Sequence, residues 1–204
     1  MPEESPDGWE ALVRVAAALG SRDRGAIVTA LELAAVEAAP TAVDEVLLQS
    51  HLFIGFPDAL NAMVLWRQVS GSEPPEATIE SPEDWVERGA RVCDTVYGGS
   101  YTKLRANVAA LHPDLDKWMV TGGYGRVIGR PQLDLVTREL CIVALLAVWG
   151  APRQLHSHLR GALNAGATPR SIDSALDIAT THLDPQSTGR VLDLWESIKA
   201  RILP

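Results

Sequence analysis

The chain has 204 residues, of which 47% are hydrophobic, and it carries a formal net charge of -8 with a sequence pI near 5.1. A chain of this length can bury one sizeable core without disulfides or metals to hold it together. The acidic balance argues against a surface for nucleic acid or anionic membranes, because both require clustered Lys and Arg. We therefore expect a soluble, cytoplasmic protein that packs as one body.

We expect neither a targeting segment nor a membrane span. Residues 1–7 are acidic and contain proline, so they predict a flexible tail and not a secretory signal. The longest apolar run, Leu140–Trp149, is far shorter than the roughly 20 residues that cross a bilayer. This run predicts a buried core helix.

Hydrophobic residues recur with the 3.6-residue period of an α-helix, and no segment shows sustained alternation. The pattern predicts an all-α fold, a bundle of helices. In the first part of the chain, helices are expected at Trp9–Ala16, at Ala26–Val36, from Pro40 onward and at Asp58–Trp66. The stretch His51–Pro57 is expected to separate the last two.

The polar, proline-containing segment 70–81 predicts a linker. Ser81, Pro82 and Asp84 have the form of a capping box that starts a helix ending at Gly98. Later helices are expected at Tyr101–Leu111, Leu115–Met119, Leu135–Trp149, Pro152–Asn164, Pro169–Thr180 and Thr188–Ile202. The predicted organisation is a tail (1–7), an N-terminal helical half-unit (8–69), the linker (70–81) and a C-terminal unit (82–204).

Residues 122–131 are rich in glycine and predict a loop. Such a loop can cradle a phosphate when it follows a strand and has the spacing GxGxxG or GxxxxGK[ST]. This segment follows no predicted strand and lacks those spacings in that context, so we do not expect it to bind phosphate.

A repeat connects the two parts of the chain. Ala39–Leu47 aligns with Thr168–Leu176. Both segments have the same order of residues: a small residue, Pro, two variable positions, a β-branched residue, Asp, two more variable positions and Leu. Each copy is followed by His-Leu, a proline and a helix that ends in Leu-Trp, at Trp66 and Trp195. Agreement in this order predicts a duplicated helical unit whose halves pack as a pseudo-dimer.

Two residues are candidates for acid–base chemistry. On a helical wheel of residues 152–164, His158 shares the inward face with Leu159, so it is either a satisfied core histidine or a proton-transfer group. Glu139 precedes the apolar part of its helix. We therefore expect it at the more solvent-exposed end of that helix, close to Arg138. There it either forms an Arg–Glu ion pair or works with a histidine as a general acid–base pair.

The two cysteines, Cys93 and Cys141, are far apart in the sequence. They form neither a CxxC motif nor the local spacing of a zinc site. We expect both to be small buried hydrophobic residues.

The region from about residue 118 to 195 resembles the carboxymuconolactone decarboxylase and alkylhydroperoxidase D superfamily. The motifs that carry the resemblance are Tyr124-Gly125, Arg130-Pro131, Thr137–Leu140 and above all HLRGALN at His158–Asn164. Residues 40–66 resemble the later half of the same unit. The resemblance implies a helical fold and homo-oligomers, trimers or hexamers, with helices packed across subunits.

In the alkylhydroperoxidase D branch, a Glu, a CxxC pair and a His relay protons to a reactive thiolate. The resemblance matches Glu139 and His158 to the Glu and the His of that relay. The thiol pair would fall at Ala151 and Gln154. Since neither is cysteine, thiol peroxidase activity by that mechanism is not expected.

The decarboxylase branch keeps the histidine, lacks the thiol pair and acts on a carboxylated lactone without a metal or organic cofactor. The resemblance implies that His158 is the acid that reprotonates carbon. It makes Tyr124, Arg130 and Arg138 candidates for substrate binding, the two arginines as holders of the carboxylate and the developing enolate. Two features depart from this branch, the presence of Glu139 and the additional segment that follows the linker.

Three functions stay open at this point. The first is a cofactor-free, decarboxylase-like or lactone-processing lyase that acts on a small molecule through Glu139 and His158. The second is a peroxiredoxin-type activity that depends on Cys141. The third is a non-catalytic helical binding or assembly protein in which His158 is sealed in the core.

Overall fold

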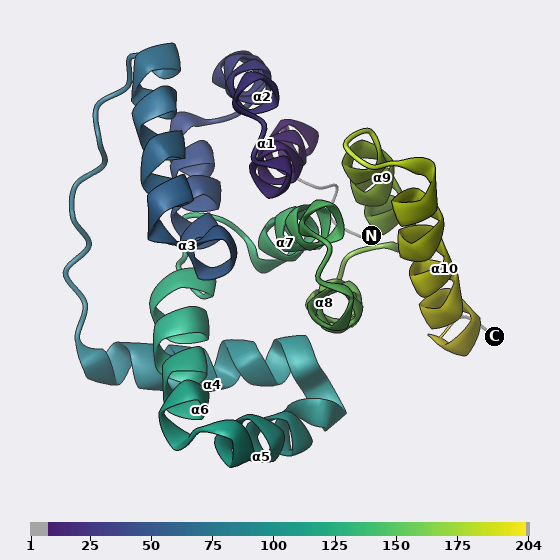
Figure 1. Cartoon of the computed structure of the whole chain (residues 1–204). Coiled ribbons are helices and arrows are strands. Elements are labelled where there is room, and N and C mark those ends of the chain that lie inside the picture. Colours follow the sequence, from purple (N-terminus) through teal and green to yellow (C-terminus); the bar gives the residue numbers. More distant parts are fainter. Residues whose placement is uncertain (1–7, 203–204) are drawn as a thin grey trace.

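The computed structural model describes residues 8–202, and all regular secondary structure in that range is helical (Figure 1). The elements are α1 (Trp9–Ser21), α2 (Arg24–Glu37), α3 (Pro40–Ser70), α4 (Pro82–Tyr97), η1 (Gly98–Ser100), α5 (Tyr101–Leu111), α6 (Pro113–Trp118), η2 (Met119–Ile128), α7 (Leu135–Trp149), α8 (Pro152–Ala165), α9 (Pro169–Thr180) and α10 (Pro185–Ile202). The predicted all-α class is confirmed. The predicted tail, residues 1–7, lies outside the described residues.

Helices α1 and α7 pack against each other in the middle of the molecule (Figure 1). α2 and α3 lie on one side of this pair, α8, α9 and α10 lie on the other, and α4 to α6 extend below α3 and α8. A Cβ on Gly20 would lie 2.6 Å from the carbonyl oxygen of Leu145, so the two central backbones approach closely at that point. Residues of both helices are buried around most of their circumference, which explains why α7 is apolar with little periodicity.

Local sequence signals set the ends of the later helices. The Asp134 side chain accepts a hydrogen bond of 2.8 Å from the backbone N–H of Thr137 and caps α7. Gly150 and Gly166, with φ of 79° and 108°, end α7 and α8 in the left-handed conformation that glycine tolerates best. The predicted bounds of α7 and α9 agree with the structure, and Thr168 caps α9 as expected.

The break in α3 is narrower than predicted. Helical backbone continues through Ile54, and only Gly55 leaves the helical region, with φ 79° and ψ 168°. Pro57 follows in the first turn of the second segment, where its missing N–H costs little. The expected separation into two helices is confirmed, but a single glycine produces it, and the second helix continues to Ser70.

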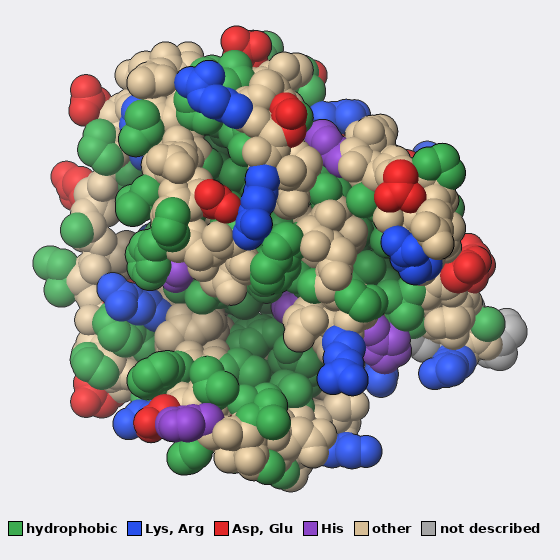
Figure 2. Space-filling view, viewed as in Figure 1, with side chains coloured by type: hydrophobic (Ala, Val, Ile, Leu, Met, Phe, Trp, Pro, Cys, Tyr) green, Lys and Arg blue, Asp and Glu red, His purple; other side chains and the backbone are tan. Residues whose placement is uncertain are grey.

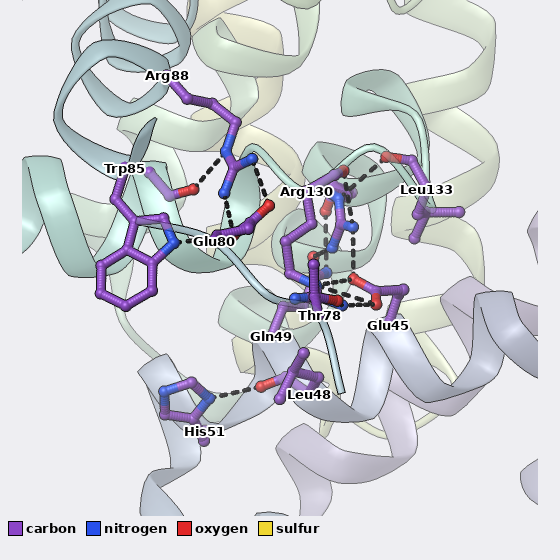
Figure 3. A network of polar contacts seen from close by, with 12 residues as sticks. Glu45, Leu48, Gln49, His51, Thr78, Glu80, Trp85, Arg88, Arg130 and Leu133 are labelled. Atoms are coloured by element: carbon purple, nitrogen blue, oxygen red, sulfur yellow. Dashed lines mark hydrogen bonds and ion pairs between the residues drawn. The ribbon is translucent and has the colours of Figure 1, made fainter. Parts of the chain in front are cut away.

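Residues 71–81 contain no regular secondary structure and run along the outside of the molecule from α3 to α4 (Figure 1). Ion pairs and hydrogen bonds hold the end of this segment in place: Arg88 donates to both carboxylate oxygens of Glu80 at 2.7 Å (Figure 3). The predicted capping box is confirmed, since Ser81 and Asp84 exchange side chain to backbone hydrogen bonds.

The prediction of a glycine-rich loop at residues 122–131 was wrong, because residues 119–128 form the helix η2 with a wide, π-type hydrogen-bonding pattern. This helix crosses α4 with almost no space between the backbones. A Cβ on Gly125 would overlap the carbonyl oxygen of Trp85, and a Cβ on Gly89 would overlap that of Val120. The glycines therefore serve close helix packing and not a turn.

The sequence repeat coincides with a repeated arrangement in space. Pro40 and Pro169 each start a helix, and Trp66 and Trp195, at the same offset, are almost fully buried. One pocket of about 340 Å³ lies among α1, α2 and α3, and a second of about 210 Å³ lies among α7, α8 and α10. Seven pairs of residues at that same offset line the two pockets, among them Leu19 and Val148, Ile54 and Leu183, and Ala62 and Val191.

Helices long and apolar enough to span a membrane are absent from residues 8–202.

Candidate active site

Glu139 of α7 and His158 of α8 meet inside the molecule. Their side chains form a hydrogen bond of 2.8 Å between Nδ1 of His158 and Oε2 of Glu139. The Glu139 side chain is fully buried, and the His158 side chain keeps 7% of its surface exposed. The inward orientation predicted for His158 is confirmed, and the structure brings the two predicted site residues into direct contact.

Contrary to the prediction, Glu139 does not lie at a solvent-exposed end of its helix. α7 is covered by α1, α8 and α9, so residues 137–147 are buried on every face of the helix. Glu139 also does not pair with Arg138, because adjacent helical residues point about 100° apart. Arg138 points instead toward α3, where it donates to Glu45 at 2.7 Å.

Gly161 allows α8 to approach the buried carboxylate. A Cβ at this position would lie 2.8 Å from Oε2 of Glu139 and 2.7 Å from Cγ1 of Val96. Any side chain on residue 161 would therefore press against the carboxylate or against α4. This requirement gives a physical reason for the glycine within the motif HLRGALN.

Each partner of the pair has one polar atom without a hydrogen bond in the part of the chain that the structure describes. Oε1 of Glu139 is buried and has no partner there. Nε2 of His158 also has none, because only Nδ1 is engaged. Burying an unpaired carboxylate oxygen is costly, so a water molecule or a ligand group is expected to meet it.

One aromatic ring packs against the pair, and two tyrosines lie near enough to feel the charge of Glu139. Phe53 of α3 packs edge-on against His158, with ring centroids 5.9 Å apart. The Tyr124 hydroxyl donates to the Tyr97 hydroxyl at 2.9 Å. Burial, with a smaller contribution from the negative charge of Glu139, raises the pKa of Tyr97 to about 12, and burial raises the pKa of Tyr124 well above its usual range. Both phenols therefore keep their protons at neutral pH and act as donors.

Tyr97 is a neighbour of the candidate residue Tyr124 that sequence reasoning missed. It lies in α4, in the additional segment outside the motifs that resemble the superfamily, so no motif pointed to it. The predicted Tyr124 is 3% exposed and contacts Tyr97 through its hydroxyl. Tyr97 is therefore the more accessible of the two tyrosines.

Arg130 and Arg138 both bind Glu45, and neither forms a hydrogen bond with His158 in the described residues. Figure 3 shows Arg130 beside Glu45. Arg130 binds both carboxylate oxygens of Glu45 at 2.9 Å, and Arg138 adds a third contact at 2.7 Å. The remaining donors of Arg138 bind backbone carbonyls and Gln49. Because the Arg138 side chain is fully buried and its donors are occupied, this cluster works as an ionic link between α3 and α7.

A pocket of about 700 Å³ lies between α3 and η2, and its lining is mostly apolar. Leu52 and Phe56, which lie on either side of Phe53 in the sequence, belong to this lining, and Arg126 contributes a positive charge. This volume is in the range of small-molecule sites. Figure 2 also shows a hollow with a hydrophobic floor between α3, α8 and the segment α4–α6, with histidine side chains near it.

Both cysteines are buried, as predicted. Burial raises the pKa of the Cys93 thiol to about 12 and raises that of Cys141 further. Neither thiol is therefore poised to act as a thiolate at neutral pH.

Comparison with known families agrees with the motifs around His158. Residues 113–193 match the model of the carboxymuconolactone decarboxylase family. The comparison shows that this part of the chain is similar to the carboxymuconolactone decarboxylase family. The matched region includes η2, α7, α8 and α9, and thus contains Glu139 and His158, whereas Tyr97 lies outside it.

Two curated proteins are similar over a longer part of the chain. Peroxisomal protein 2 of Schizosaccharomyces pombe is 28% identical over 142 residues, which cover 66% of this chain. Peroxisomal protein 2 of Saccharomyces cerevisiae is 23% identical over 164 residues, which also cover 66% of this chain. The matches span 65% and 58% of the two relatives, less than two thirds of either.

Proposed function

We propose that this carboxymuconolactone decarboxylase-like chain is a cofactor-free acid–base catalyst. In this proposal Glu139 and His158 move a proton on a small carboxylated or lactone substrate. The observation that carries the proposal is the 2.8 Å contact between the two side chains at a buried position where His158 keeps a small exposed surface. A buried carboxylate that orients an imidazole is a general arrangement for proton transfer.

The contact gives each atom a role. Glu139 fixes the ring through Nδ1 and stabilises the positive charge of the imidazolium, so that Nε2 is the nitrogen available to a substrate. In decarboxylation, the bond from carbon to the carboxylate breaks and its electron pair moves into a conjugated carbonyl as CO₂ leaves. Nε2–H of His158 then protonates the carbon as the enolate electrons return, and solvent restores the proton to the imidazole.

The apolar pocket between α3 and η2 supports a substrate with a hydrophobic body. Phe53, whose sequence neighbour Leu52 lines that pocket, packs against His158. We propose that this part of α3 separates the pocket from the pair and sets the size of substrate that reaches Nε2.

The proposal is tested with a panel of conjugated lactones, carboxylated lactones and β-keto acids. CO₂ release and the incorporation of deuterium from D₂O into the product are followed by NMR. His158→Gln and Glu139→Gln should each lower turnover by about 10²- to 10⁴-fold, because each removes half of the proton-transfer pair. His182→Gln, which changes a histidine that forms no hydrogen bond with Glu139 or His158 in the described residues, should retain activity. Turnover that survives in His158→Gln, for every substrate accepted, would contradict the proposal.

The alternative function is a thiol-dependent peroxidase, and the burial and raised pKa values of the two thiols argue against it. Both cysteines are buried and their pKa values are raised, and Ala151 and Gln154 occupy the positions of the thiol pair. If peroxide is consumed, Cys141→Ser should leave the rate unchanged. A lower rate of peroxide consumption in Cys141→Ser would instead support a thiol-dependent peroxidase.

The expected homo-oligomer and the expected cytoplasmic location stay predictions. Exposed apolar side chains on α3 and α6, including Phe56, Leu60, Val64 and Trp118, favour contact with another subunit. Sedimentation velocity would reveal whether the chain is a trimer, a hexamer or a monomer. The names of the two relatives refer to the peroxisome, so the location of this chain is best examined by imaging a tagged copy in its own cells.

A further inference from the structure

A second pocket, of about 190 Å³, lies between α8 and the helices α4 and α5. Lys103 of α5 and Arg160 of α8 line it from opposite sides, and His156 lies beside them. Tyr97 also lines this pocket. None of the residues that line it is acidic, although the chain as a whole carries a net charge of -8.

The positive charges in this pocket are not neutralised within the described part of the chain. Neither Lys103 nor Arg160 forms an ion pair or a side-chain hydrogen bond with residues 8–202, whereas other arginines on these helices, Arg88 and Arg105, are paired with carboxylates. Burial and the positive charges of Arg160 and Arg201 lower the pKa of His156. The surroundings of His156 are therefore electropositive.

Neutral donors complete the lining. The Tyr97 hydroxyl accepts a hydrogen bond from Tyr124, so its own hydrogen is free for another acceptor. The side chains of Asn107 and Ser100 also line the pocket and can donate. Two cations with several neutral donors and no carboxylate form a set that suits an oxyanion.

We propose that this pocket binds a small molecule through a carboxylate or a phosphate group. Lys103 and Arg160 supply the charge, and Tyr97 donates to an oxygen of the bound group. This site goes beyond the proposed function, because Arg160 points away from the face of α8 that carries His158, and binding does not require the catalytic pair. It also identifies a role for α4 and α5, which precede the part of the chain that matches the family model.

The test is an NMR titration of the ¹⁵N-labelled full chain with inorganic phosphate and, separately, with succinate. Chloride keeps the ionic strength constant, so that general screening does not imitate binding. We expect saturable shifts of amide signals from residues around Tyr97 and Arg160. The double variant Lys103→Ala/Arg160→Ala should bind at least tenfold more weakly, because it loses both charge-assisted contacts.

Two control variants define the site. Arg153→Ala removes an exposed cation from the same helix outside the pocket and should leave the affinity unchanged. Glu139→Gln should also bind as the unchanged chain does, which separates this site from the catalytic proposal. Preference for phosphate or for succinate identifies the group that the pocket recognises.

Binding of neither probe would overturn the proposal. Equal affinity of the double variant and the unchanged chain would overturn it as well, since the bound anion would then lie elsewhere. Because Lys103 and Arg160 are exposed, the double variant should fold normally, and thermal unfolding followed by circular dichroism verifies this.

Discussion

The two repeated halves of this chain share an arrangement of helices but differ in what their central helices bury. α1 and α2 bury only small and aliphatic residues in the described part of the chain, whereas α7 and α8 bury Arg138, Glu139 and His158. The carboxylate of α1, Glu10, is exposed. Hydrophobic packing requires only suitable volume and pattern, whereas a buried ionisable group requires a particular partner. Under the proposed function, the first half therefore mainly supports the structure and the second carries the chemistry.

The largest difference between the halves should appear in activity. Glu139→Gln should reduce turnover of any accepted substrate by about 10²- to 10⁴-fold, because the imidazole loses its negatively charged partner. Glu10→Gln, the matched change in α1, should have no effect on turnover. Steady-state kinetics on both variants measures the contrast, and similar losses in the two would remove the proposed division of roles.

The ionic link between the halves should dominate stability. Glu45→Ala leaves Arg138 buried without its partner and should lower the free energy of unfolding by about 3–5 kcal/mol. Glu32→Ala on the exposed face of α2 should change it by less than about 0.5 kcal/mol. Urea unfolding followed by circular dichroism gives both values. A loss of under about 1 kcal/mol for Glu45→Ala would show that the cluster is not a main source of stability.

Two glycines of the C-terminal half should respond in opposite directions. Gly161→Ala forces a methyl group against Glu139 and Val96 and should cost about 1–3 kcal/mol of unfolding free energy. Gly189→Ala in α10 meets open space and should stabilise the protein by about 0.5–1 kcal/mol, since alanine favours a helix. Thermal unfolding distinguishes them, and a stabilising Gly161→Ala would mean that α8 is packed less tightly than the structure indicates.

The smallest expected effect concerns the two equivalent tryptophans. Nε1 of Trp195 donates to Asp173 at 2.6 Å, whereas Nε1 of Trp66 is buried without a partner in the described residues. Trp195→Phe should therefore be more destabilising than Trp66→Phe by about 1 kcal/mol, the net contribution of a hydrogen bond. Denaturant titrations of the two variants compare them under the same conditions. Equal losses would show that Trp66 Nε1 also has a partner, such as a bound water.

Much of the fold follows from local sequence. Asp134, Thr168 and Ser81 cap helices as their positions predict, and Gly150 ends α7 at the expected place, because capping depends on residues a few positions apart. The inward direction of His158 also follows from helical periodicity. The motifs that resemble the family contain both Glu139 and His158, although they do not indicate that the two side chains touch.

Only the tertiary structure decided which buried groups meet. Arg138 and Glu139 are neighbours in sequence, yet one reaches Glu45 on α3 and the other reaches His158 on α8. The helical form of residues 119–128 depends on contact with α4, and the place of Tyr97 beside Tyr124 depends on the same contact. The sequence by itself determined the helices and their buried faces through short-range periodicity and capping. The partners of the buried charges were decided by the packing of distant helices, which no local pattern encodes.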